Sequence, residues 1–400
     1  MHITREEEGM LSGESGQATA KAMQLLVALG DVLDAERLIP IESAQIAGVS
    51  YGNIGEAGRD LLEEWASNGA RVRVRSTLNP AGMDLSKWRE MGVDDDYHDN
   101  QVRVIKAFEG MGVGITCTCT PYLVGNAPRR GAHIAWSESS AIGYANSVLG
   151  SKTNREGGPS ALAAAVTGRT PHYGLHLDEN RRATVAIEVK ARMDTTFDFG
   201  LLGYTVGRII GSGVPLIEGL THADSDRLKI MSAALAASGG IALFHVKGST
   251  PEAAGQSASG LERLCIDQKE LEISRERLSA DGEPDLACVG CPHCSAGELR
   301  DLAMALKGRR VSRGKGLWVW TSRGVRDSAA AAGEVAAIEK AGGRVFADTC
   351  MVVCPLEKSG FGHMVSNSCK AAHYVPSTAR LKATVAQLYT CIDKVTEETV

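Results

Sequence analysis

Ten cysteines are distributed over this chain of 400 residues, and three of them occupy positions typical of reactive or metal-binding thiols. Cys119, Cys291 and Cys350 each follow a strand-like run and lie beside Pro, Thr or Gly residues. Cys265 and Cys391 lie inside helical patterns instead, where a free cysteine is a common small core residue. The N-terminus lacks the apolar core of a signal peptide, so we expect a cytoplasmic protein whose thiols stay reduced.

Cys291 is also the middle thiol of a CxxCxxC motif with Cys288 and Cys294, which is a metal-binding spacing. A structural zinc site requires four nitrogen or sulfur ligands, usually as two close pairs. The pairs that could complete such a site are Cys350 with Cys354 and Cys117 with Cys119. An iron–sulfur cluster held by thiolates is the alternative, and spacing alone does not separate the two. An iron with an open coordination position could act as a Lewis acid on a hydroxyl group.

The polar stretch 115–158 has the composition of a binding site, because so many buried polar groups would all need hydrogen-bond partners. Within it, Arg155 is the candidate cation for a substrate carboxylate, with a structural ion pair to Glu138 or Glu156 as the alternative. The expected hydrogen-bond donors around a substrate are Ser139, Ser140, Asn146 and Asn154. Apolar spacing over 141–149 predicts a short helix with one buried face. Outside the stretch, the side chains that could also lie near the thiols are His176, Lys370 and His373.

Strand-like and helical segments alternate along the chain, which predicts an α/β fold with parallel sheets covered by helices. Ligands in such folds bind beyond the carboxyl ends of the strands, where the three thiols are expected. Residues 112–120 are predicted to form a strand and residues 382–395 a single helix. The length predicts more than one domain, and a change in composition favours a division into 1–230 and 231–400, or into three parts.

Composition argues against several classes of function. The 43 Lys and Arg residues against 48 Asp and Glu residues give a net charge of −5, which does not favour nucleic acid as a partner. No apolar run approaches the ~20 residues of a membrane-spanning helix. The glycine-rich turns lack the GxGxxG pattern that binds dinucleotides.

Several longer motifs together resemble the large subunits of the aconitase X family, over nearly the whole chain. These motifs are TCTPY at 118–122, AWSESSAIGYANSVLGSKTNREGG at 135–158, GRTPHYGLHLDENR at 168–181, GCPHCS at 290–295, DTC at 348–350 and NSCKAAHY at 367–374. The resemblance implies an aconitase-like multidomain fold and a hydro-lyase with an iron–sulfur cluster, either 4Fe-4S or 2Fe-2S. It further implies that the cluster ligands are Cys119, Cys291 and Cys350. Gln45 stands where many members of the family are expected to have histidine.

The resemblance also implies a small subunit that supplies a catalytic serine as the base, so no catalytic base is assigned within this chain. Two substrates are compatible with the family, and we favour dehydration of cis-3-hydroxy-L-proline to 1-pyrroline-2-carboxylate over dehydration of mevalonate 5-phosphate. Arg129, Arg130, Lys152 and Arg155 leave a phosphate-bearing substrate possible in principle. The remaining alternatives are a zinc-stabilised binding or assembly protein, based on the CxxCxxC motif, and an RNA-binding protein, which the acidic net charge disfavours.

Overall fold

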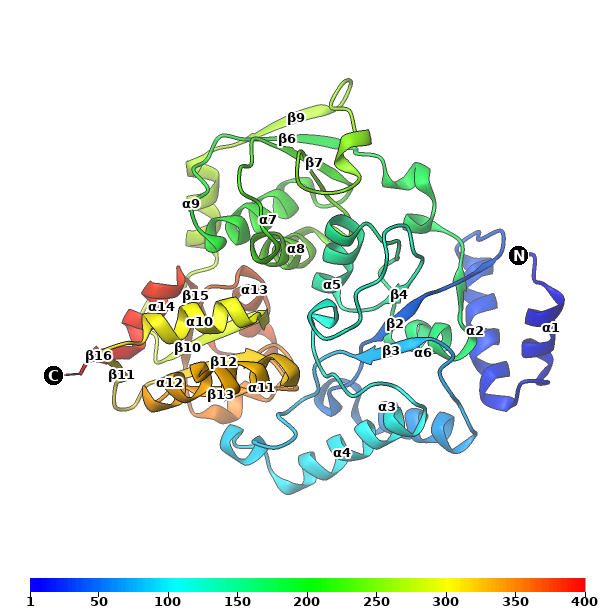
Figure 1. Cartoon of the computed structure of the whole chain (residues 1–400), viewed down its shortest axis with the longest axis horizontal. Coiled ribbons are helices and arrows are strands. Elements are labelled where there is room, and N and C mark those ends of the chain that lie inside the picture. Colours follow the sequence, from blue (N-terminus) through cyan, green and yellow to red (C-terminus); the bar gives the residue numbers. More distant parts are fainter. Residues whose placement is uncertain (400) are drawn as a thin grey trace.

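The computed structural model describes residues 1–399, and its main strands form three parallel sheets from successive parts of the chain (Figure 1). In the first part, β2 (Ser43–Ile46) lies between β3 (Arg75–Leu78) and β4 (Ala135–Trp136). A short antiparallel pair joins β1 (Leu38–Pro40) to β5 (Arg169–Pro171). The helices of this part are α1 (Arg5–Ser12), α2 (Gln17–Val32), α3 (Tyr51–Ser67), α4 (Asp95–Gly110), α5 (Ser139–Tyr144) and α6 (Gly158–Thr167).

The second part contains a four-stranded parallel sheet in the order β8-β7-β6-β9. Its strands are β6 (Val185–Val189), β7 (Pro215–Glu218), β8 (His245–Val246) and β9 (Glu262–Ile266), and its helices are α7 (Thr196–Ile210), α8 (Ser225–Gly239) and α9 (Gln268–Arg277). Helices α7 and α8 pack closely because glycine removes the side chain at their contact. A Cβ atom at Gly203 would lie 2.6 Å from the carbonyl oxygen of Met231.

The third part contains a five-stranded parallel sheet in the order β13-β12-β10-β14-β15. Its strands are β10 (Leu286–Cys294), β12 (Gly316–Thr321), β13 (Arg344–Phe346), β14 (His363–Ser366) and β15 (Lys382–Val385). The helices around it are α10 (Ala296–Ala305), α11 (Arg323–Ala332), α12 (Glu334–Lys340), α13 (Cys369–Thr378) and α14 (Leu388–Val395). A second antiparallel pair, β11 (Arg309–Val311) with β16 (Thr396–Glu398), lies near the C-terminus.

Helix α5 lies in the middle of the molecule, between the three sheet-containing parts (Figure 1). It packs against α8 of the second part, and its N-terminal residue Glu138 bonds to Lys370 of α13 in the third part. The largest hydrophobic cluster joins the second and third parts, while separate clusters lie under the first part and on the other face of the third. The helix within the polar stretch therefore begins at the place where all three parts of the molecule meet.

The predicted α/β fold with parallel sheets is confirmed. The predicted short helix is confirmed as well: it consists of α5, followed by one π-helical turn over Ala145–Leu149. The predicted strand at 112–120 is wrong, because Cys117 adopts a left-handed backbone with φ of 42°. The predicted helix at 382–395 is also wrong in its first half, where β15 pairs with β14. The division near residue 230 stays a prediction; residues 230 and 231 both lie inside α8. No helix of residues 1–399 is long and apolar enough to cross a membrane.

Candidate active site

Cys119, Cys291 and Cys350 come from three different segments and lie near one another. Cys119 belongs to the coil that follows residue 114, Cys291 to the end of β10 beyond its regular pairing, and Cys350 to the loop after β13. Each thiol is only 5–6% exposed. Burial raises the pKa of the Cys119 thiol, and the charges of Glu138, Cys350 and Cys291 raise it further. Burial followed by the charge of Cys291 likewise raises the pKa of Cys350, so the three thiols are electrostatic neighbours.

The other thiols of the sequence motifs point elsewhere. Cys288 shares the large hydrophobic cluster with Cys291 and Cys350 but lies earlier in β10, in its regularly paired part, whereas Cys294 lies in the cluster on the opposite face of the third sheet. Cys117 belongs to the core of the first part, and its nearest charges are Asp348 and Arg323. The CxxCxxC thiols therefore do not converge, which removes the basis for the zinc alternative.

The three neighbouring thiols are of the donor type that iron–sulfur clusters use. Among residues 1–399, no three His, Cys, Asp or Glu side chains have the geometry to hold one metal ion. A tetrahedral zinc site with bonds of about 2.3 Å needs its sulfur atoms only about 3.8 Å apart. Iron–sulfur clusters are held by cysteine thiolates, each on an iron of the cluster. The donor set of Cys119, Cys291 and Cys350 is therefore compatible with an iron–sulfur cluster.

Glu138 and Lys370 form a largely buried ion pair beside these thiols, with side chains 12% and 10% exposed. Burial opposes ionisation of Glu138, but the Lys370 ammonium and hydrogen bonds from Lys370 and Ser140 lower its pKa to about 2. The charges of Glu138 and Cys291 also raise the pKa of Lys370 despite its burial. The pair is therefore fully ionised at neutral pH, and Lys370 supplies positive charge next to Cys291.

Neighbouring side chains hold Glu138 in place at the N-terminus of α5. Asn79 Nδ2 donates to Glu138 Oε2 at 3.0 Å, and Gln45 Oε1 accepts from the Glu138 backbone N–H at 2.9 Å. Ser140 Oγ donates to Glu138 Oε1 at 2.9 Å. Lys370 Nζ reaches Ser139 Oγ at 3.1 Å. The structure thus brings together three of the expected residues, Ser139, Ser140 and Lys370. The ion-pair partner of Glu138 is Lys370 and not Arg155.

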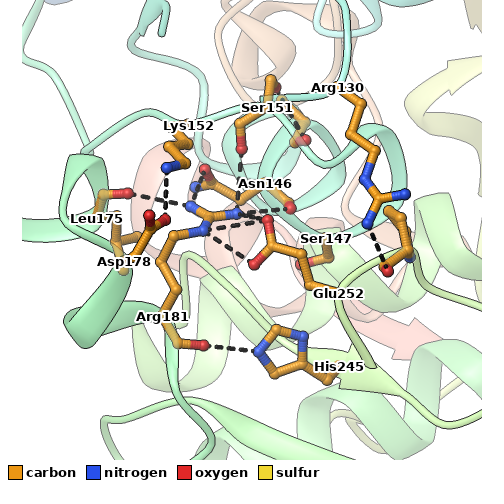
Figure 2. Close-up of polar contacts among 12 residues, drawn as sticks. Arg130, Asn146, Ser147, Ser151, Lys152, Leu175, Asp178, Arg181, His245 and Glu252 are labelled. Carbon is orange, nitrogen blue, oxygen red and sulfur yellow. Dashed lines mark hydrogen bonds and ion pairs between the residues drawn. The ribbon is translucent and has the colours of Figure 1, made fainter. Parts of the chain in front are cut away.

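Three of the expected substrate-binding residues bond to the chain itself. Asn146 accepts from the buried Arg181 guanidinium, which also pairs with Glu252 at 2.7 Å (Figure 2). Asn154 donates to the Tyr173 carbonyl at 3.0 Å. His176 Nδ1 lies 2.9 Å from His133 Nδ1, in a histidine group apart from the thiols. None of these three joins the Glu138–Lys370 pair.

Arg155 and His373 also lie outside the Glu138–Lys370 group. Arg155 is exposed, and its Nη1 donates to the Gly240 carbonyl at 3.1 Å. Among the described residues it pairs with neither Glu138 nor Glu156, so the alternative of a structural ion pair is wrong, while its role toward a substrate stays a prediction. His373 Nδ1 lies 3.2 Å from the Tyr204 hydroxyl.

His293 is a site residue that the sequence did not single out. Its imidazole lies 2.8 Å from Thr118 Oγ1 and 2.8 Å from the Thr349 carbonyl oxygen, and its backbone N–H donates to Cys119 Sγ at 3.2 Å. Burial lowers its pKa to about 4, so the ring is neutral at ordinary pH. The only sequence signal was its place inside the GCPHCS motif.

Family models confirm the class that this fold and site define. Models of the first, second and third domains of aconitase X match residues 1–179, 183–276 and 284–397. The chain therefore belongs to the aconitase X family. Its relatives of known activity are dehydratases, so the hydro-lyase class predicted from the motifs is confirmed.

Individual relatives differ in their stated substrates. The chain is 50% identical to the phosphomevalonate dehydratase large subunit of Methanothermobacter thermautotrophicus, over 96% of each chain. The large subunit of the same name from Methanosarcina mazei is 45% identical over 99% of this chain and 97% of its own. Cis-3-hydroxy-L-proline dehydratase of Pseudomonas aeruginosa is 37% identical over 97% of this chain but only 68% of its own.

A solved structure supports the same relationship. The crystal structure of Thermococcus kodakaraensis aconitase X in its holo-form matches with a TM-score of 0.92 and 43% identity. The match covers 99% of this chain and 100% of that chain. The aconitase X architecture thus extends over the described fold.

Proposed function

We propose that the chain is the large subunit of an iron–sulfur mevalonate 5-phosphate dehydratase. The observation that carries this proposal is the pattern of identities: 45–50% to four phosphomevalonate dehydratase large subunits of matching length and 38% to a fifth, against 35–37% to cis-3-hydroxy-L-proline dehydratases. This pattern reverses the preference for the imino acid that the sequence alone favoured.

A separate small subunit is part of the proposal. The phosphomevalonate dehydratase relatives are named large subunits, and the match spans 96–97% of the two compared above. The cis-3-hydroxy-L-proline dehydratases are longer, since the match covers only 68% of each. We therefore expect this chain to act together with a small subunit, as the name of these relatives implies.

The cofactor would be held by the Cys119, Cys291 and Cys350 thiolates. When bound, an iron–sulfur cluster supplies a Lewis-acidic iron that assists departure of a hydroxyl group. Lys370 contributes a fixed positive charge next to Cys291, which offsets the negative charge of the thiolates and of a bound carboxylate.

Glu138 serves to orient and not to abstract a proton. A general base works best with a pKa near the operating pH, whereas the carboxylate of Glu138 has a pKa of about 2 and is engaged by Lys370, Asn79 and Ser140. Its remaining role is to hold Lys370 and Ser139 toward the thiols, where both can bind a substrate oxygen. The base is then left to the small subunit, where the family resemblance expects a serine.

A phosphate group needs a cation that is free to bind it. Arg129 pairs with Glu42 and Lys152 with Asp178, so both already have a carboxylate partner. Arg155 is exposed and has only the Gly240 carbonyl as its partner among the described residues. Arg130 is likewise exposed, and its partner among the described residues is the Pro251 carbonyl at 3.1 Å. We therefore assign Arg155 to the phosphate or the carboxylate of the substrate, with Arg130 as the second available cation of the polar stretch.

The test is to express the chain with a small subunit of the same family, purify the complex anaerobically, and supply mevalonate 5-phosphate. Loss of water, measured by mass spectrometry, with iron and sulfide bound to the complex is the expected result. A complex that leaves mevalonate 5-phosphate unchanged, while dehydrating cis-3-hydroxy-L-proline, would contradict the proposed substrate.

A further inference from the structure

His293 uses all four of its polar groups in hydrogen bonds, although the residue is completely buried. The backbone N–H donates to Cys119 Sγ, and the two ring nitrogens lie 2.8 Å from the Thr118 hydroxyl and the Thr349 carbonyl. The backbone carbonyl accepts from Lys229 Nζ at 3.3 Å. One residue thereby contacts the segments that carry Cys119 and Cys350, and it lies two positions after Cys291 itself.

The acceptors around the ring determine which nitrogen carries the proton. A carbonyl oxygen can only accept, so His293 Nε2 must donate to the Thr349 oxygen. In a neutral imidazole Nδ1 is then the acceptor, and the Thr118 hydroxyl must donate to it. Thr118 Oγ1 is left to accept from the backbone N–H and the hydroxyl of Thr120, both at 3.1 Å. All of these groups have hydrogen-bond partners only if Thr120 donates to Thr118 and Thr118 donates to His293. This order of donors fixes the orientation of the His293 ring.

Lys229 extends the same network into the second part of the chain. Its ammonium is 2% exposed and pairs with Asp226 at 3.1 Å and with Glu298. Glu298 in turn belongs to the capping box that begins α10, directly after the CPHC segment. His293 therefore makes hydrogen bonds to residues of the first, second and third family domains at the same time.

We propose that His293 is the positioning residue for the three cluster thiolates: in its Nε2–H tautomer it ties the Thr118–Cys119 and Thr349–Cys350 segments to the Cys291 loop. This inference rests on the proposed iron–sulfur function. Outer partners that orient metal ligands typically change metal retention by about 10–100-fold when they are removed. A histidine that only fills the core would not need partners next to two thiols.

His363 offers a matched control within the same sheet. It is also buried, and its Nε2 lies 2.8 Å from the Thr384 hydroxyl of the neighbouring strand β15, with no hydrogen bond to the residues beside Cys119 or Cys350. Leucine at either position removes a buried imidazole and its hydrogen bonds. Only the His293 substitution releases the thiol segments. Comparing His293→Leu, His293→Gln and His363→Leu therefore separates positioning from a general loss of stability.

The experiment measures iron and sulfide per complex and the half-time of iron release to excess ferrozine. We expect His293→Leu to release iron about 10–100-fold faster than the wild type. We expect His293→Gln, whose amide can both donate and accept, to recover most of that loss, and His363→Leu to behave as the wild type. Equal release rates for His293→Leu and wild type, or for the two leucine variants, would overturn the proposal.

A second readout does not depend on the cluster. The ¹⁵N shifts of the His293 ring in the metal-free chain should report the Nε2–H tautomer, and Thr118→Val should weaken its preference. An Nδ1–H tautomer would overturn the inference. A wild-type complex without iron and sulfide would instead contradict the proposed cofactor, so the two failures are distinguishable.

Discussion

Lys370 of α13 donates a hydrogen bond to the Glu138 carboxylate at the start of α5, 232 residues earlier in the chain. This contact joins the third part of the molecule to the polar stretch of the first, within reach of the thiols. Removing one partner of a buried ion pair lowers the stability of the protein more than replacing both partners does, because the single remaining charge stays desolvated.

Lys370→Met should therefore abolish dehydration and lower the free energy of unfolding by about 3–5 kcal/mol. The double variant Lys370→Met with Glu138→Gln should regain part of this stability, while activity stays absent. Urea unfolding and turnover of the reconstituted complex check the two halves of the prediction. Additive losses of stability in the double variant would show that the two side chains do not interact.

The low pKa of Glu138, about 2, predicts how stability depends on pH. A carboxyl whose pKa falls on folding stabilises the protein above its unfolded pKa, and this contribution disappears as the pH falls toward the folded pKa. The unfolding free energies of wild type and Glu138→Gln should thus differ most above the ordinary glutamate pKa of 4.5. The difference should shrink by about 2 kcal/mol between about pH 6 and about pH 3. A difference that stays constant with pH would argue against a depressed pKa.

Single serine substitutions should divide the cysteines into two groups. Cys119→Ser, Cys291→Ser and Cys350→Ser should each reduce the iron and sulfide content of the anaerobically purified complex to a small fraction of the wild-type value. Cys288→Ser and Cys294→Ser should retain iron, since Cys288 lies in the regularly paired part of β10 and Cys294 in the core on the opposite face of the third sheet. Stoichiometric zinc that depends on Cys288 and Cys294 would restore the zinc alternative.

Local patterns predicted the alternating strands and helices, but not where their side chains meet. The sequence offered Glu138 or Glu156 as an alternative partner of Arg155, whereas the actual partner of Glu138, Lys370, becomes visible only when the three parts assemble. The CxxCxxC spacing suggested a common site, yet the register shift between Val289 and Cys294 separates the motif's thiols between two cores.

Backbone conformation limited two further predictions. The alternating residues 112–120 are typical of a strand, but the left-handed conformation of Cys117 ends the extended backbone before it can pair. The residues from 382 onward have a helical pattern, but the first four form β15 because β14 offers an open parallel edge. Neither the positive φ nor the open edge can be inferred from a periodicity within one segment.

Arg155→Ala should lower kcat/KM for mevalonate 5-phosphate by about 10–100-fold, because a charged hydrogen bond typically contributes about 1.5–3 kcal/mol. Most of the effect is expected in KM, and Arg155→Lys should recover part of it. Arg129→Ala is the matched control, since Arg129 lies in the same stretch, is 86% exposed and pairs with Glu42. Equal kinetics for Arg155→Ala and Arg129→Ala would remove Arg155 from the substrate site.

The most direct test of the account is the ratio of kcat/KM for mevalonate 5-phosphate and cis-3-hydroxy-L-proline, measured on one preparation of the complex with its cluster intact. We predict a ratio well above about 100, because a site built for a charged group rejects a substrate that lacks it. A ratio near or below one would contradict the assignment as a mevalonate 5-phosphate dehydratase large subunit.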